Sequence, residues 1–279
     1  MTDPSLLSPL GKPTEYRAQY APDLLFAIPR QLKRDELGVS AGVLPFVGED
    51  VWNAYEVSWL NSRGKPVVAL ASFRFSASSP NLIESKSFKL YLNSFNQTVF
   101  DNLVAVEALL VRDLSAVSGA SVAVRLIDLN CQPQVVVGYP QGLLLDRLEV
   151  DCTTYLPDPG LLACSLDEAV LPVEEMLYSH LLKSNCLVTG QPDWAMLLIR
   201  YRGRPISHEG LLRYIVSFRN HNEFHEQCVE RIFCDISHRC RPEALLVHAS
   251  YTRRGGLDIN PWRSSGEFVL PEIRREVRQ

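Results

Sequence analysis

An internal repeat constrains the fold of this 279-residue chain more than any other sequence feature. Residues 61–66 (NSRGKP) resemble residues 201–205 (YRGRP), and residues 89–95 (KLYLNSF) resemble residues 212–218 (LRYIVSF). Repeated segments in the same order indicate two copies of one structural unit. The alternative is a chance similarity between short amphipathic segments.

The hydrophobic pattern predicts the same order of elements in both halves. Residues 52–61 and 66–75 alternate around a Gly-containing turn, which predicts a β-hairpin. Two amphipathic helices, 85–95 and 100–114, and a strand, 121–129, follow. In the second half we expect a strand over 194–202, helices over 208–218 and 224–234, and a strand over 244–251. The fold class is therefore α+β, with two tandem ββααβ-type units whose sheets are antiparallel and whose helices pack on one face.

The chain divides into three parts on this basis. Residues 1–45 are rich in Pro and polar residues and show no clear period, so we expect an N-terminal arm. Residues 46–158 form the first unit and residues 159–279 the second. The turn-rich segment 155–160 marks the linker between the units.

Composition excludes several classes of function. The net charge of −4 argues against an electrostatic grip on nucleic acid. Neither a secretory signal nor an apolar run of membrane-spanning length is present, so we expect a cytoplasmic protein without membrane contact. Seven cysteines without a regular framework indicate reduced thiols. The spacing of Cys228, Cys234, His238 and Cys240 does not suit zinc, so no metal is expected.

Cys186 is the candidate nucleophile. It lies in the polar segment 184–194 (SNCLVTGQPDW), which predicts an accessible loop. Asp193 follows past a Gly-Gln-Pro turn, and a carboxyl group near a thiol can accept its proton and later return one. The alternative is an ordinary loop cysteine with a turn aspartate, and spacing alone does not decide between them.

Three further segments have side chains suited to an anion or a heterocycle. Residues 84–87 (ESKS) begin a predicted helix and offer hydroxyl and ammonium groups to an anion, although Ser85 or Ser87 could simply cap the helix. Residues 224–226 (FHE) can bind the hydrogen-bonding edge of a heterocycle, and residues 253–256 (RRGG) can seat a phosphate. A solvated helix start and a solvated turn are the respective alternatives. No Gly-x-Gly-x-x-Gly segment indicates a Rossmann site.

Together, residues 84–96, 184–194 and 219–226 resemble the motifs of the 7-cyano-7-deazaguanine reductases, the nitrile reductases of queuosine biosynthesis. The resemblance covers nearly the whole chain and is to the family's two-unit form. The first unit keeps the ESKS signature and the second keeps His225 and Glu226. The resemblance implies a tunnelling fold in each unit and a homodimer.

The resemblance also implies roles for individual residues. Cys186 would form a covalent thioimide with the nitrile, Asp193 would transfer protons, and His225 would lie beside the nitrile. Residues implied to bind the substrate are Leu82, Ile83, Glu84, His225 and Glu226. Residues implied to bind NADPH are Ser85, Lys86, Arg254 and Gly255. The implied reaction is the four-electron reduction of a nitrile to a primary amine.

Three other functions fit parts of this set. A cysteine hydrolase of nitriles would use Cys186 and a carboxylate but no nicotinamide. A non-catalytic tunnelling-fold protein would bind a purine or pterin through Glu84 and Glu226. A zinc cyclohydrolase would need stoichiometric metal. Consumption of NADPH on addition of the nitrile distinguishes the reductase from the hydrolase. Loss of turnover in Cys186→Ala distinguishes it from the binding protein, and elemental analysis tests for the zinc of a cyclohydrolase.

Overall fold

The computed structural model describes residues 16–131, 136–165, 170–271 and 274–279. They form two compact units, and each contains segments that are distant in sequence. The first unit comprises residues 16–33, 49–131 and 253–259. The second comprises residues 34–48, 136–165, 170–252, 260–271 and 274–279.

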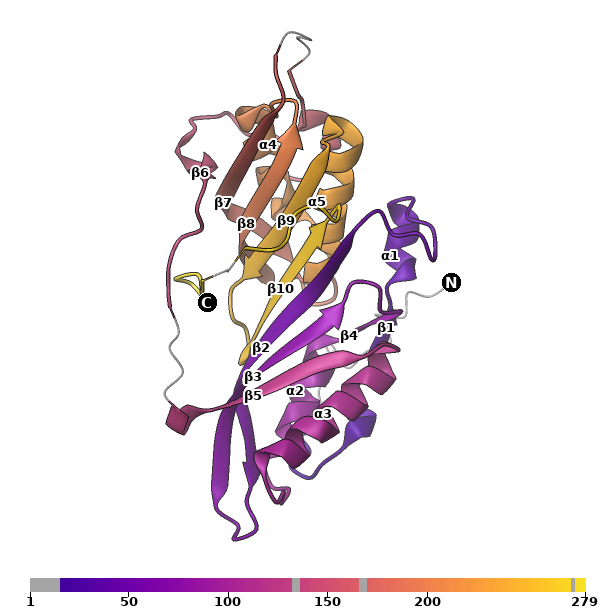
Figure 1. The fold of residues 1–279 in the computed structure, drawn as a ribbon, viewed down its shortest axis with the longest axis vertical. Helices are drawn as coiled ribbons and strands as arrows, with labels where there is room; N and C mark the ends of the chain where they lie inside the picture. Colours follow the sequence, from indigo (N-terminus) through magenta and orange to yellow (C-terminus); the bar gives the residue numbers. More distant parts are fainter. Residues whose placement is uncertain (1–15, 132–135, 166–169, 272–273) are drawn as a thin grey trace. The chain divides into compact units, whose positions relative to one another are not determined.

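In the first unit, the antiparallel hairpin of β2 (Val47–Leu60) and β3 (Pro66–Ser76) extends onto β5 (Val122–Asp128) in the order β5-β3-β2. Helices α2 (Ser85–Asn93) and α3 (Leu103–Ser118) lie on one side of these strands (Figure 1). The hairpin, both helices and the third strand were all predicted, and the structure confirms them with small changes of boundary.

An irregularity in β2 determines which of its side chains enter the core. Trp52 and Ala54 are buried on one side of the irregularity, and Val57 and Trp59 on the other, so the alternation changes parity between them. A β-bulge has this effect because one extra residue shifts every later side chain. The buried side chains of β2 share one apolar core with residues of α2 and α3, including Phe88.

The predicted N-terminal arm contains regular structure. Strand β1 (Ala27–Pro29) pairs antiparallel with β4 (Asn81–Ile83), and α1 (Gln31–Glu36) follows it. The lack of a hydrophobic period in this segment was misleading, because β1 and α1 are too short to show one. Residues 1–15 of the predicted arm lie outside the described residues.

The second unit repeats the order of elements. Its main sheet contains β10, β9, β8 and β7 in that order, all antiparallel, and β6 pairs parallel with β7. The bounds are β6 (Leu143–Leu144), β7 (Val173–Asn185), β8 (Pro192–Gly203), β9 (Ala244–Tyr251), β10 (Leu257–Ser264), α4 (His208–Ser217) and α5 (His225–Cys240). The first three residues of β10 belong to the first unit. The structure confirms the predicted α+β class and ββααβ order in both units (Figure 1).

Short 3-10 helices connect several of these elements. They span Pro22–Leu24, Leu129–Cys131, Leu145–Arg147, Pro159–Leu161 and Phe218–Asn220. The one at Pro159–Leu161 overlaps the predicted linker.

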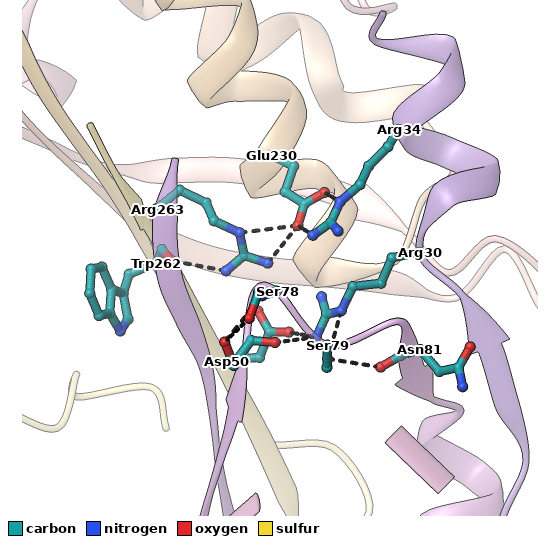
Figure 2. Close-up of polar contacts among 10 residues, drawn as sticks. Arg30, Arg34, Asp50, Ser78, Ser79, Asn81, Glu230, Trp262 and Arg263 are labelled. Atoms are coloured by element: carbon teal, nitrogen blue, oxygen red, sulfur yellow. Dashed lines mark hydrogen bonds and ion pairs between the residues drawn. The ribbon is translucent and has the colours of Figure 1, made fainter. Parts of the chain in front are cut away.

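Buried ion pairs stabilise both units (Figure 2). In the second unit, the Glu230 carboxylate of α5 accepts hydrogen bonds from the guanidinium groups of Arg34 and Arg263. In the first unit, Arg30 donates to the Asp50 carboxylate at 2.5 Å and to the Ser79 hydroxyl. Buried guanidinium groups need such partners because an unpaired charge is costly to remove from water.

Candidate active site

Cys186 immediately follows β7 in a closed turn. Its amide donates to the Gln191 carbonyl at 2.8 Å, and its own carbonyl accepts from the Gly190 amide at 3.0 Å. Gly190 has a φ of +65°, which glycine adopts without strain. Cys186 is only 4% exposed, so the predicted accessible loop is wrong. The polar composition of the segment did not reveal that the turn closes over its cysteine.

Residues 221–223 hydrogen-bond to Asn185, the residue that precedes Cys186. The Asn185 amide donates to the His221 carbonyl at 2.8 Å, and the Asn185 carbonyl accepts from the Glu223 amide at 3.1 Å. The Asn185 side chain also donates to Asn222 at 3.0 Å. These three bonds fix the backbone at the start of the nucleophile turn. Residues 221–223 lie within the segment 219–226 that carries the family resemblance, but no individual role was predicted for them.

A buried ion pair between Glu223 and Arg231 stabilises the segment 221–223 that binds Asn185. Its carboxylate accepts two hydrogen bonds from Arg231, at 3.0 and 2.8 Å, and lies 2.8 Å from the His221 Nε2. Burial raises the pKa of Glu223, but the hydrogen bonds from His221 and Arg231 outweigh burial, and the pKa is lowered from its ordinary value. Glu223 therefore carries a negative charge at neutral pH and holds both partners.

Asp193 and His225 face each other in the same unit. Asp193 is the second residue of β8 and pairs directly with Ser184 of β7. His225 is the first residue of α5, and its Nε2 lies 3.4 Å from Asp193 Oδ1. Both side chains are largely buried. A carboxylate opposite an imidazole forms a unit through which a proton can pass.

Two further features surround this pair. Glu226 follows His225 in the first turn of α5 and is 4% exposed, where the helix dipole favours a negative charge. The ring of Tyr251, at the end of β9, packs edge-to-face on His225 with centroids 4.0 Å apart. The second unit thus places Cys186 and Asp193 at the closed end of the β7–β8 hairpin, with His225 opposite Asp193.

In the first unit, Glu84 is the N-cap of α2. Its two carboxylate oxygens accept the amides of Lys86 and Ser87, each at 2.7 Å. A cap by Ser85 or Ser87 is therefore wrong, and the Ser87 hydroxyl donates back to the Glu84 carbonyl. Glu84 is 1% exposed, and burial raises its pKa above the ordinary value although both amides act in the opposite direction. Leu82 and Ile83, on the adjoining β4, are also buried.

The predicted phosphate segment is a tight turn against α2. Arg254 and Leu257 exchange backbone hydrogen bonds around Gly255 and Gly256, whose φ values are +58° and +77°. A Cβ on Gly255 would lie 2.5 Å from Lys89 Nζ, so the turn lies close to this ammonium group, and the φ of +58° favours glycine there. A glycine turn beside cationic side chains is chemically suited to phosphate, and these residues fit NADPH.

No group of three metal-binding side chains among the described residues is arranged to hold a metal ion. Within the same part of the chain, no helix has the length and apolarity needed to cross a membrane.

Two family models match the chain. Residues 16–126 match "Nitrile reductase, 7-cyano-7-deazaguanine-reductase N-term" and residues 192–268 match "QueF-like protein". A crystal structure of archaeosine synthase QueF-Like is also similar, with 16% identity over 37% of this chain and all of that chain. Its TM-score of 0.31 is too low to establish a shared fold.

Curated relatives match over almost their whole length. A protein of Dechloromonas aromatica is 66% identical over all of this chain and 98% of its own. Relatives from an Azoarcus species and from Cupriavidus metallidurans are 61% and 59% identical over 98% of this chain, and over 95% and 98% of their own lengths. All three are named NADPH-dependent 7-cyano-7-deazaguanine reductase. The chain belongs to the family of NADPH-dependent 7-cyano-7-deazaguanine reductases.

Proposed function

We propose that this chain catalyses the NADPH-dependent reduction of 7-cyano-7-deazaguanine to 7-aminomethyl-7-deazaguanine, in queuosine biosynthesis, through a thioimide on Cys186. The main support is the second unit, where the backbone beside Cys186 is clamped and the Asp193–His225 pair lies at the same end of the hairpin. Holding a nucleophile and a proton carrier in one rigid geometry removes much of the entropic cost of reaction.

In the first step, the Cys186 sulfur adds to the nitrile carbon and the thiol proton passes through Asp193 to the nitrile nitrogen. This addition forms one C–S bond, converts the triple bond to a C=N bond and expels nothing. The buried turn keeps water from the thioimide. When bound, NADPH would supply hydride, and the four-electron reduction needs two hydrides. Cys186 leaves as thiolate once its carbon has gained the first of them, and Asp193 and His225 are placed to supply protons to the nitrogen.

Glu84 and Glu226 would bind the donor edge of the deazaguanine, with Leu82 and Ile83 against its ring. Although Glu84 already accepts two amides, a carboxylate has about four lone-pair sites, so it can also accept N–H groups of the substrate. The fixed cap orients these remaining lone pairs. His225 would contribute to both binding and catalysis.

For the cofactor, Ser85, Lys86, Arg254 and Gly255 are proposed to hold NADPH, with the cations on its phosphates. The close approach of the Gly255 turn to Lys89 supports this assignment. The first unit would thus carry the cofactor signature and the second the nucleophile. From the family resemblance we also propose tunnelling-fold units and a homodimer. From the sequence pattern and composition we propose a cytoplasmic location and the division 1–45, 46–158 and 159–279.

The test is the loss of NADPH absorbance on addition of the nitrile. We expect two NADPH consumed per nitrile by the wild-type chain and none by Cys186→Ala. Cys152→Ala, which removes a half-buried thiol outside the proposed site, should consume NADPH normally. Release of ammonia without NADPH consumption would instead show a hydrolase. Nitrile binding without any turnover would show a binding protein.

A further inference from the structure

We propose that Tyr251 is a positioning residue, whose buried ring holds the His225 imidazole opposite the Asp193 carboxylate. This inference rests on the proposed function, because it assumes that His225 and Asp193 act together on the substrate. It assigns a role to a side chain that the sequence motifs do not include.

The strand register brings the tyrosine to the site. Tyr251 pairs directly with Ala195 across β8 and β9, and Ala195 lies two residues after Asp193. Side chains two residues apart point to the same face of a sheet, and directly opposite residues share a face. Tyr251 and Asp193 therefore lie on one face of this sheet, and the first residue of α5 contacts both.

The contacts of His225 restrict its ring from two directions. Its Nε2 lies 3.4 Å from Asp193, and its ring packs on Tyr251 with centroids 4.0 Å apart and planes at 62°. This edge-to-face contact fixes the plane of the imidazole, which the contact with Asp193 alone does not. Without the tyrosine ring, χ2 of a histidine has a broad range.

Tyr251 is suited to position the imidazole without exchanging protons itself. It is 1% exposed, and burial raises the pKa of its hydroxyl well above the ordinary value, with Cys228 and Asp193 adding to the effect. The phenol stays neutral at any working pH, so it does not compete with Asp193 or His225 for the proton. The ionisable groups that interact electrostatically with Asp193 include Lys183 on β7, Tyr251 on β9 and Cys228 on α5.

The inference separates the ring of Tyr251 from its hydroxyl. Within the described residues that hydroxyl makes no hydrogen bond of normal geometry, although Cys228 and Ser184 lie close enough to it to affect its pKa. The positioning role is assigned to the ring because the ring is the part of Tyr251 that contacts His225. Tyr251→Phe keeps the ring and should retain kcat within about threefold. Tyr251→Leu should lower kcat by roughly 10²-fold, the cost of a small misplacement of a reacting group, with little change in KM for the nitrile.

A double variant distinguishes positioning from general destabilisation. If Tyr251 acts through His225, then His225→Ala combined with Tyr251→Leu should be no slower than His225→Ala alone. Tyr214→Leu is the matched control, because Tyr214 is a fully buried tyrosine of α4 that packs on Phe218. It should lower stability and leave kcat per folded molecule unchanged. Tyr251→Met replaces Tyr251→Leu if the latter does not fold.

Three results would overturn the positioning role, and the first two concern the size of the loss. One is a kcat for folded Tyr251→Leu or Tyr251→Met within threefold of wild type, and the other is a loss that adds fully to that of His225→Ala. A Tyr251→Phe variant as slow as Tyr251→Leu would assign the effect to the hydroxyl and also contradict the proposal. If the wild-type chain itself consumes no NADPH with the nitrile, the proposed function fails, which is a separate outcome.

Discussion

Glu230 offers a quantitative test of the forces that hold the second unit together. Its carboxylate, on α5, accepts hydrogen bonds from Arg34 at 2.9 and 2.7 Å and from Arg263 at 3.1 and 2.8 Å. All three side chains are at most 6% exposed. Glu230→Gln removes the charge but keeps the volume, so no cavity contributes to the effect. It removes the negative charge that both buried guanidinium groups contact (Figure 2).

We expect a large loss of unfolding free energy, because removal of one member of a buried ion pair destabilises a protein by about 3–5 kcal/mol. Here one carboxylate serves two cations, so we expect the upper part of that range. The total free energy of unfolding of a typical domain is about 5–15 kcal/mol. The variant should therefore unfold at much lower urea concentration, as measured by tryptophan fluorescence.

Glu174→Gln is the control for this experiment. Glu174 pairs with Arg200 at 2.5 Å in the same unit, but the two side chains are 42% and 32% exposed. Solvent-exposed ion pairs contribute about 0–1 kcal/mol to the free energy of unfolding. Equal losses of unfolding free energy for Glu230→Gln and Glu174→Gln would refute the assignment of stability to the buried cluster.

Two other predictions concern buried titrating groups. Burial lowers the pKa of His248 to about 4, against about 6.5 in the unfolded chain. Because the unfolded state then binds the extra proton, stability should fall by about 3 kcal/mol as pH falls from about 6.5 to about 4, and urea titrations of His248→Leu should show a shallower fall. Burial also raises the pKa of the Cys228 thiol to about 12. Alkylation at pH 8 followed by peptide mass analysis should label the exposed Cys131 and leave Cys228 unmodified, and equal labelling in the folded protein would contradict this.

The sequence predicted those elements whose hydrophobic pattern is regular. Strand β9 was predicted with its observed bounds, and the β2–β3 hairpin was recognised from a Gly-containing turn between alternating segments. Helix α5 was recognised but ended too early at Cys234, because the polar residues after it hide the helical period.

The two long strands that were missed, β7 and β10, share a physical cause. In β7, serines occupy inward positions, for example the fully buried Ser179 and Ser184, so the apolar alternation is interrupted. Strand β10 is almost wholly buried, and its alternation of apolar and polar residues covers only Leu257–Asn260 before Pro261 interrupts it. In both strands, neighbouring elements determine the conformation more than local preference does.

The sequence identified candidate residues of the site but not how they are arranged in space. The local sequence pattern predicted Cys186 and Asp193. The hydrogen bonds that hold Asn185, however, come from a segment 36 or more residues away. Arg34 and Glu230 are 196 residues apart, and no short motif links them. Likewise, the position of Tyr251 beside His225 follows from strand register, which a single sequence did not reveal.

The central claim is that Cys186 adds covalently to the nitrile. It is tested most directly by the intact mass of the protein incubated with 7-cyano-7-deazaguanine in the absence of NADPH. Because the addition expels nothing, wild-type protein should gain the whole mass of the nitrile, while Cys186→Ala should gain none and Cys152→Ala should behave as wild type. An unmodified wild-type mass under conditions where the nitrile is shown to bind would contradict the account.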